Sequence, residues 1–229
     1  MALEFIKSLK ACKVDDNIRA VVITGSGKAF CAGQDLNEVT GEDALPVEKV
    51  VSEHFNPLVR NIRDLDKPVI AAVNGVAAGA GANLALACDI VIATASASFI
   101  QAFSKIGLIP DSGGTYFLPR LIGLPRATAL MMLGDKVSAK EAKAMGMIYA
   151  VSEDDAFVQD VQTLASRLAN LPTKGLGLTK RALNYSLDND IDKQLDIECQ
   201  LQATACLSQD HVEGINSFLE KRKPTFTGQ

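Results

Sequence analysis

The stretch from Val69 to Thr94 constrains the fold more than any other part of the sequence. It holds an apolar run, an Asn-Gly turn, a loop of small residues, an apolar helical segment and a second apolar run. Two buried strands joined through a helix form a βαβ unit, in which the strands are parallel. We therefore predict strands at Val69–Val73 and Ile90–Ala93, connected by a helix that ends near Ala87.

The remaining hydrophobic periodicity predicts an α/β core followed by a helical C-terminal region. Ser138, with Glu141 three residues later, is the signature of a capping box at the start of a helix. We assign residues 1–172 to the core and residues 173–229 to the helical region. The other predicted elements are a helix over residues 2–12, a strand over Arg19–Thr24, a helix over Pro46–Leu65, and helices from Asp154 to Lys223 interrupted at Pro172 and around Leu187–Asp192.

Composition excludes several classes of protein. The chain has 229 residues, 48% of them hydrophobic, and 23 basic against 27 acidic side chains, for a net charge of −4. This mild acidity, without a basic stripe, argues against nucleic-acid binding, and no apolar run is long enough to predict a membrane span. Five cysteines without a C-x-x-C pair indicate reduced thiols in the cytoplasm, and two scattered histidines give no metal or Ser-His-Asp set.

The loop Gly79-Ala80-Gly81-Ala82 lies between the first strand of the βαβ unit and its helix. The first N–H groups of a helix have no intrahelical partner, so they can bind an anion or a carbonyl oxygen that gathers negative charge. The alternative is that small residues only allow close packing of the helix on the sheet. Dinucleotide binding has little support, because the spacing is G-x-G-x-x-L and no acidic ribose ligand follows.

A second loop, Phe30 to Leu36, follows the predicted strand at Arg19–Thr24. Gly33 allows a sharp turn that would aim the Gln34 N–H at a ligand, while Asp35 caps the next helix. An ordinary turn with a helix cap is the alternative. Two such loops at strand ends favour a ligand site, because ligands of α/β proteins bind at the carboxyl edge of the sheet.

Asp111 is the candidate acid or base. It lies between Pro110 and the Ser112-Gly113-Gly114 turn, in an otherwise apolar neighbourhood. A carboxyl group in a low-dielectric cleft has a raised pKa, which suits it to shuttle a proton. The alternative is that Asp111 simply caps a helix.

Four separated motifs together resemble the crotonase, or enoyl-CoA hydratase/isomerase, superfamily: AFCAGQDL, KPVIAAVNGVAAGAGANLALACD, FSKIGLIPDSGGTYFLPRLIG and SAKEAKAMGMI. The resemblance extends from near residue 4 to the end of the chain. Within the superfamily, the chain is most similar to the ring-1,2-epoxyphenylacetyl-CoA isomerases of phenylacetate breakdown, through GVAAGAGANLAL, AFSKIGLIPD and EGINSFLEKRKPTFTG. The resemblance implies an α/β fold built as a spiral of ββα units, with a helical C-terminal trimerisation region.

The resemblance also implies a set of site residues. The backbone N–H groups of Gln34 and Ala80, with Gly81 beside them, would form an oxyanion hole for the thioester carbonyl of an acyl-CoA. Asp35, Leu36 and Asn37 would line the acyl and pantetheine path. Phe218 and Lys221 on the last helix are further candidates for contact with the nucleotide end of coenzyme A.

Two departures from the hydratase pattern decide the expected reaction. Hydratases of the family use two glutamates to activate water, and the matching positions hold Asn83 and Phe103, which are assigned to substrate binding. Asp111 matches the single catalytic carboxylate of the family's isomerases. We therefore expect an acyl-CoA isomerase that shifts a double bond or converts 1,2-epoxyphenylacetyl-CoA to oxepin-CoA, without metal or redox cofactor. An enoyl-CoA hydratase and a non-catalytic acyl-CoA-binding subunit are the alternatives.

Two expectations concern the chain's edges and partners. Family members usually begin with a β-hairpin, which we expect to be missing here, leaving one edge of the sheet unpaired. We also expect self-association as a trimer or a dimer of trimers, because the helical region carries apolar faces. These faces include Leu195, Ile197, Leu201, Leu207, Ile215 and Phe218.

Overall fold

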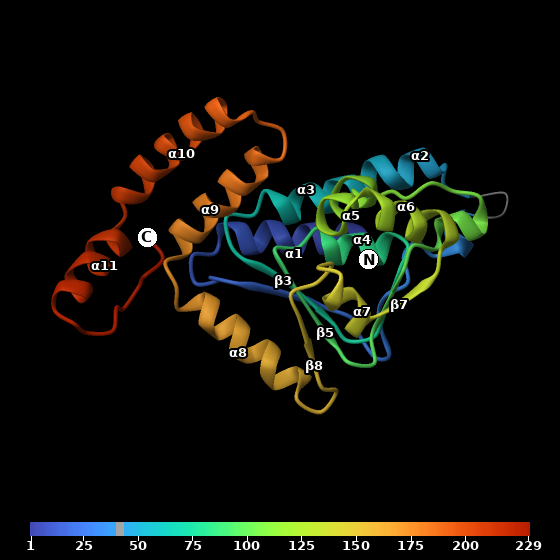
Figure 1. The fold of residues 1–229 in the computed structure, drawn as a ribbon, viewed down its shortest axis with the longest axis horizontal. Coiled ribbons are helices and arrows are strands. Elements are labelled where there is room, and N and C mark those ends of the chain that lie inside the picture. The colour runs from blue at the N-terminus through green and yellow to red at the C-terminus, as the bar shows by residue number, and fades with distance from the viewer. Residues whose placement is uncertain (40–43) are drawn as a thin grey trace.

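The computed structural model describes residues 1–39 and 44–229, which form two four-stranded sheets covered by helices (Figure 1). The first sheet has the order β1 (Val21–Thr24), β3 (Val69–Val73), β5 (Ile90–Thr94) and β8 (Ala150–Ser152). The second has the order β2 (Ala29–Cys31), β4 (Val76–Ala78), β6 (Ser98–Ile100) and β7 (Lys136–Ser138). All neighbours are parallel except β6 and β7.

The chain places strands alternately in the two sheets from β1 to β6 and inserts helical segments after each pair. The helical segments are α1 (Ala2–Val14), η1 (Leu36–Val39), α2 (Val47–Lys49), η2 (Val50–Phe55), α3 (Asn56–Arg63), α4 (Ala80–Leu86), η3 (Ala102–Ile106), α5 (Gly114–Ile122), α6 (Leu124–Leu133), α7 (Ala139–Ala144), α8 (Phe157–Ala169), α9 (Thr173–Ser186), α10 (Ile191–Cys206) and α11 (Gln209–Leu219). The α/β spiral of ββα units expected from the resemblance is confirmed. The capping box of Ser138 and Glu141 is also present at the start of α7.

The predicted βαβ unit is confirmed, with one addition. β3 and β5 are parallel neighbours, with Ile70 opposite Ile90. The small-residue stretch predicted as loop contains β4, which joins the second sheet. Gly75 explains how the chain crosses over, because a Cβ there would lie 2.2 Å from the Lys28 carbonyl oxygen, so only glycine fits.

Every residue of β3 is buried, because helices cover both faces of the first sheet. Alternate side chains point to opposite faces, so Val69, Ala71 and Val73 join the main core. Ile70 and Ala72 face the other way and form a second cluster with Phe157 and other residues of α8. This packing fixes the strand ends that carry the loops described below.

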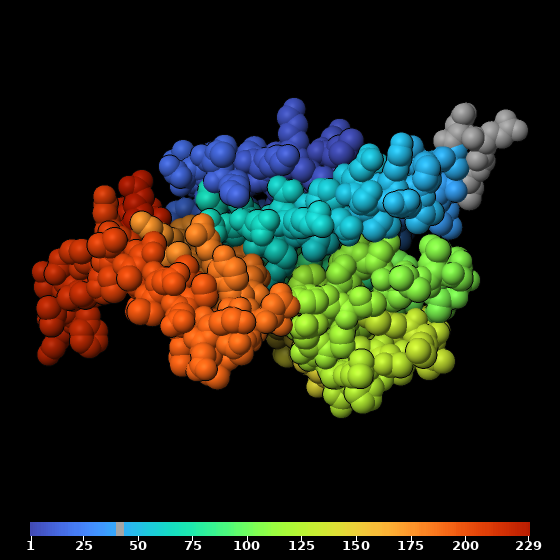
Figure 2. Space-filling model, turned by 90° about the horizontal axis from the view of Figure 1, so that it is seen from above, coloured from blue at the N-terminus to red at the C-terminus, as the bar shows by residue number. Residues whose placement is uncertain are grey.

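The C-terminal helices α10 and α11 extend away from the sheets as an arm (Figures 1 and 2). Helix α9 connects this arm to the core, since the buried Lys180 ammonium lies 2.8 Å from the Asp89 carboxylate at the start of β5. The predicted interruption at Pro172 is confirmed, and the one predicted around Leu187–Asp192 is shorter, because α9 ends at Ser186 and α10 begins at Ile191. The break between α10 and α11, at Leu207 and Ser208, was not predicted. Helix α9 belongs to the predicted helical region and packs on the core. The division into residues 1–172 and 173–229 stays a prediction. Within residues 1–39 and 44–229, no helix is both long and apolar enough to cross a membrane.

Candidate active site

One cavity of about 660 Å³ gathers most of the candidate residues. Its wall is built from the loop after β2, the start of α4, the η3 segment, the helical turns of α2 and η2, and Asp111. Of the residues singled out from the sequence, Gln34, Asp35, Leu36, Ala80, Phe103 and Asp111 line it. Loops at the ends of three different strands therefore meet around one space, as the edge of a parallel sheet predicts.

Two backbone N–H groups lie at the contact between the first two loops. Gly33 has φ +94°, and a Cβ there would lie 3.4 Å from the Ala80 nitrogen, so the loop that carries Gln34 abuts the first residue of α4. No acceptor in residues 1–39 or 44–229 takes the N–H of Gln34 or of Ala80. This is the arrangement expected of an oxyanion hole, in which fixed donors stabilise charge that develops on a carbonyl oxygen.

Gly81 has a different place from its neighbours. A Cβ on Gly81 would lie 2.2 Å from the Cys31 carbonyl oxygen, so this glycine lets α4 pack tightly on the end of β2. It does not appear on the cavity wall. The close-packing reading of the small-residue loop therefore holds for Gly81, whereas Ala80 faces the cavity.

Asp35 organises the turn that enters η1. Its Oδ1 accepts hydrogen bonds from the Asn37 backbone N–H at 2.9 Å and from Asn37 Nδ2 at 3.0 Å. The prediction that Asp35 caps the next helical segment is confirmed, although that segment is a short 3-10 turn. Asn37 lies behind Asp35 and does not line the cavity.

Asp111 presents its carboxylate at the cavity wall and is held through its neighbours. The Ser112 hydroxyl donates to Oδ1 at 2.9 Å, and the Asp111 carbonyl oxygen accepts from the Gly114 N–H at 2.9 Å. The reading of its side chain as a helix cap is wrong, because α5 begins after Gly113 and has no side-chain cap. Burial raises the pKa of Asp111 above its ordinary value of 3.8, and the Ser112 hydrogen bond opposes that rise.

The two positions that depart from the hydratase pattern have distinct surroundings. Phe103 is buried and contributes its ring to the cavity wall near Gly79. Asn83 is completely buried, and its Nδ2 donates to the Asp111 carbonyl oxygen at 2.9 Å. Its Oδ1 accepts from Gln101 Nε2 at 2.7 Å. Asn83 therefore supports the Asp111 loop from behind and is not part of the cavity wall.

Sequence reasoning missed Gln101 and gave Ser112 no role of its own. Gln101 follows β6 without any local motif, so only the fold brings its amide to Asn83. Ser112 carried a signal, because a serine directly after a candidate carboxylate can donate to it, but its left-handed φ of +52° was not readable.

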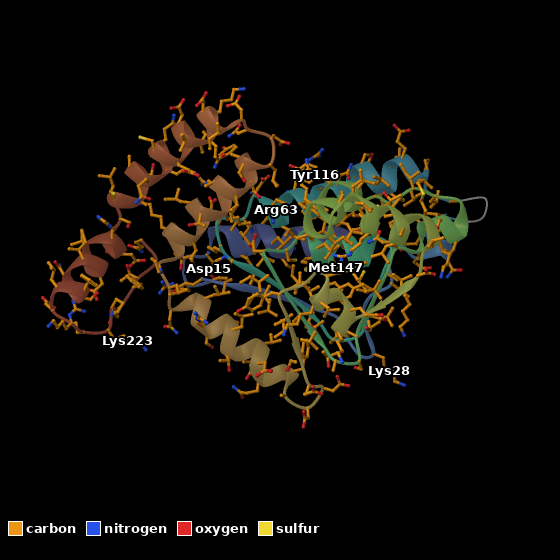
Figure 3. All side chains as sticks on the ribbon, viewed as in Figure 1. Asp15, Lys28, Arg63, Tyr116, Met147 and Lys223 are labelled. Atoms are coloured by element: carbon orange, nitrogen blue, oxygen red, sulfur yellow. The ribbon has the colours of Figure 1, made fainter. Side chains whose placement is uncertain are left out.

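Phe218 and Lys221 do not reach this cavity within one chain. Phe218 lies on α11, which is remote from α4 (Figure 1). It lines a separate hollow between α9 and α11. Lys223, two residues after Lys221, lies at the end of the arm, remote from Arg63 and Tyr116 (Figure 3). Their predicted contact with coenzyme A stays a prediction.

The cavity wall carries few ionisable groups. Apart from Asp111, these are the exposed Asp35 and Lys105. Among the described residues, no group of three His, Cys, Asp or Glu side chains could hold a metal ion. This wall therefore presents backbone N–H groups and one partly buried carboxylate.

Comparison with known proteins identifies the family of this chain. The family described as Enoyl-CoA hydratase/isomerase matches residues 1–229. The 1,2-epoxyphenylacetyl-CoA isomerase of Escherichia coli K12 is 50% identical over 232 residues, covering 100% of this chain and 88% of the relative. A protein of Rhodobacter capsulatus named "Probable enoyl-CoA hydratase" is 47% identical over 211 residues, covering 92% of this chain and 82% of its own length. The crystal structure of enoyl-CoA hydratase from Bacillus anthracis superposes with a TM-score of 0.93 at 35% identity, covering 100% of this chain and 88% of that one.

Proposed function

This chain belongs to the enoyl-CoA hydratase/isomerase family, and we propose that it is an isomerase that moves a proton between carbons of an acyl-CoA thioester. The observation that carries the proposal is the single partly buried carboxylate, Asp111, on a wall that also holds two backbone donors. The family match supports an enzyme of the enoyl-CoA hydratase/isomerase family; the acyl-CoA substrate and the isomerase reaction are our assignment.

The Gln34 and Ala80 N–H groups bind the thioester carbonyl oxygen in this proposal. Removing a proton from the carbon next to that carbonyl places negative charge on the oxygen as an enolate forms. Donors fixed by the packing of Gly33 against Ala80 stabilise this charge without having to reorganise. The free energy gained is specific to the enolate, so it lowers the barrier and not only the dissociation constant of the substrate.

Asp111 then performs both proton transfers. With a 3-enoyl thioester, its ionised carboxylate removes a proton from carbon 2, and the carbon 2 electron pair delocalises over the thioester and the double bond. The protonated carboxyl returns a proton to carbon 4, which leaves the double bond between carbons 2 and 3. Its raised pKa makes the carboxylate a stronger base than an ordinary aspartate, which favours removal of the carbon 2 proton.

The same base suits a second substrate class. The relative from Escherichia coli is named for 1,2-epoxyphenylacetyl-CoA, and proton removal next to the thioester of such a substrate would start the expansion of the epoxide-bearing ring to oxepin-CoA. The lining of Val47, Val50, Val51 and Phe55 is apolar, which accommodates an uncharged acyl group. Neither reaction requires a metal ion or a redox cofactor.

Water addition is the less supported reaction. It needs a second acid or base to position and deprotonate water, and the two family positions for that work hold Asn83 and Phe103. The Asn83 amide already bonds to Gln101 and to the Asp111 carbonyl oxygen. A hydratase would have to activate water with Asp111 alone.

A product assay tests the assignment. The protein is mixed with 3-enoyl-CoA, 2-enoyl-CoA and 1,2-epoxyphenylacetyl-CoA, and products are identified by mass spectrometry and NMR. We expect mass-neutral isomers from 3-enoyl-CoA or from the epoxide. Products 18 Da heavier as the main outcome would instead identify a hydratase. Tight binding by calorimetry without conversion of any ester would identify a non-catalytic binding subunit.

We also propose that the protein self-associates through its arm. Leu207, at the end of α10, and Phe218, on α11, are 86% and 83% exposed, so the arm presents large apolar residues to solvent. A trimer, or a pair of trimers, would cover them. All five cysteines are free thiols, which suits the predicted cytoplasmic location.

A further inference from the structure

Ser112 combines a left-handed backbone with a buried position. It is one of two residues other than glycine with a positive φ among the described residues, at +52°. Its side chain is also almost completely buried, with 1% exposure. A left-handed backbone favours glycine, which this turn uses at the next position, Gly113, with φ +77°. A serine in such a position is strained, and strain of this kind is typical of functional sites.

The contact that the strained turn creates is with Asp111. The Ser112 hydroxyl donates to Asp111 Oδ1 at 2.9 Å, and no other residue in the described part of the chain donates to the carboxylate. A neutral hydroxyl that donates to a carboxylate stabilises the ionised form. The Ser112 hydroxyl thereby occupies Oδ1, the backbone of Asp111 itself also bonds to the carboxylate, and we take Oδ2 as the oxygen that accepts the proton.

The main chain of the same turn is fixed independently of Ser112. Asn83 Nδ2 donates to the Asp111 carbonyl oxygen, and a Cβ on Gly114 would lie 2.2 Å from Asn83 Nδ2, so the turn is pressed against that amide. The orientation of the Asn83 amide is set by Gln101. Asn83 therefore places the backbone, and the Ser112 hydroxyl is left to set the direction and charge of the side chain.

From this geometry we infer that Ser112 is a positioning residue of the proton transfer: its hydroxyl holds Asp111 Oδ1 so that Oδ2 faces the acyl chain, and it keeps the carboxylate ionised. This inference rests on the proposed isomerase function. The charged groups around Asp111 do not replace this role. Asp35 and Lys105 are the other ionisable side chains on the cavity wall, and α4, which packs against the turn, contributes none.

The test compares Ser112→Gly with Ser112→Ala. Both remove the hydroxyl, but glycine also relieves the left-handed strain, so Ser112→Gly remains folded even where Ser112→Ala does not. We expect Ser112→Gly to lower kcat about tenfold with little change in KM, which is the usual scale for one lost hydrogen bond to a charged group. The acidic limb of the kcat/KM profile should move to higher pH, because the ionised carboxylate loses a stabilising donor.

A purely structural role for Ser112 gives a different result. Ser112→Gly would then keep the wild-type kcat and pH profile, with a melting temperature equal to or above that of the wild type, and the inference would be overturned. Adding Ser112→Gly to Asp111→Asn should have no further effect on rate, because the hydroxyl acts through the carboxylate. An active Asp111→Asn variant would contradict the proposed function itself, whereas an inactive Asp111→Asn beside an unaffected Ser112→Gly contradicts only the role of Ser112.

Discussion

The core buries an apolar interior, whereas helices α10 and α11 of the arm bury no hydrophobic side chain. In the core, β3 is buried at every position and the polar groups around the cavity are held by named partners, such as Asn83 between Gln101 and Asp111. The arm leaves large apolar side chains such as Leu207 and Phe218 exposed. The core therefore contains the candidate donors and base, whereas the arm carries the apolar surface through which we propose self-association.

The two regions are joined by charged groups rather than by a continuous apolar core. Asp89 Oδ2 accepts from the Val69 N–H and from the Lys180 ammonium, both at 2.8 Å, while Asp89 Oδ1 lies 3.3 Å from Arg63. Figure 3 places Arg63 close to the helix that carries Tyr116. Burial lowers the pKa of Lys180, which shows that desolvation works against this ammonium. The contact between α9 and the core depends on the ion pairs of Asp89 with Lys180 and Arg63. Loss of these ion pairs should lower the free energy of unfolding and leave the chemistry of the cavity intact.

Apart from loss of the base itself, the largest expected effect is on the oxyanion hole. Gly33→Val puts a branched side chain at φ +94° against Ala78 and Ala80, which should shift the Gln34 N–H. We expect kcat to fall roughly 10²- to 10³-fold, the usual loss for one oxyanion donor. Gly27→Val is the matched control, since Gly27 has φ +74° with open space around it. Equal losses of kcat in both variants would show that backbone strain, and not the donor, is responsible.

The next largest effect is expected on the free energy of unfolding, from the Lys180–Asp89 ion pair that joins α9 to the core. Lys180→Met leaves the Asp89 carboxylate partly buried with Arg63 as its remaining cation, so we expect the free energy of unfolding to fall by about 3 kcal/mol. Urea unfolding measures this loss. Lys174→Met, at an exposed position of the same helix, should change it by less than about 0.5 kcal/mol. Equal stability of the two variants would mean that α9 is held by its apolar contacts alone.

The arm should determine the size of the particle. Light scattering of the wild type is expected to give three times the 24.3 kDa of one chain, or a multiple of that. A Leu207→Glu, Phe218→Glu double variant should shift the protein toward single chains, because it places charge on the surface that a partner would cover. Val158→Glu, at an exposed apolar position on α8, should leave the mass unchanged. A wild-type particle of 24.3 kDa would contradict the role given to the arm.

The smallest expected effect is a gain in stability at the candidate base. The pKa of Asp111 is raised in the folded protein, so the folded state holds its proton more tightly than the unfolded state does. Stability is therefore lost as the pH rises from the ordinary pKa of 3.8 through the raised value. Asp111→Asn should be more stable than the wild type at pH 7 by up to about 1 kcal/mol. Thermal unfolding should show that this difference shrinks near pH 3.8; an equal gain at both pH values would contradict burial of a charge as its cause.

Sequence patterns predicted the long elements and missed the short ones, for a physical reason. Val69–Val73 is a continuous apolar run and the C-terminal region has helical periodicity over many residues, so β3 and the helical region could be read directly, although the break between α10 and α11 was missed. The strands β4 and β7 are three residues long and owe their conformation to pairing with β6. In the active site, Asp111 could be named from its setting, but the amide of Gln101 comes to Asn83 only through the fold. Local sequence carries no information on such contacts.

The most direct test of the account is the turnover of Asp111→Asn on 3-enoyl-CoA, followed by the absorbance of the conjugated 2-enoyl thioester. Asparagine keeps the size of the side chain and removes its ability to accept and return the proton. We expect kcat to fall about 10²- to 10⁴-fold while the protein remains folded and binds the ester. Turnover equal to that of the wild type would contradict the claim that one carboxylate beside two backbone donors carries the reaction.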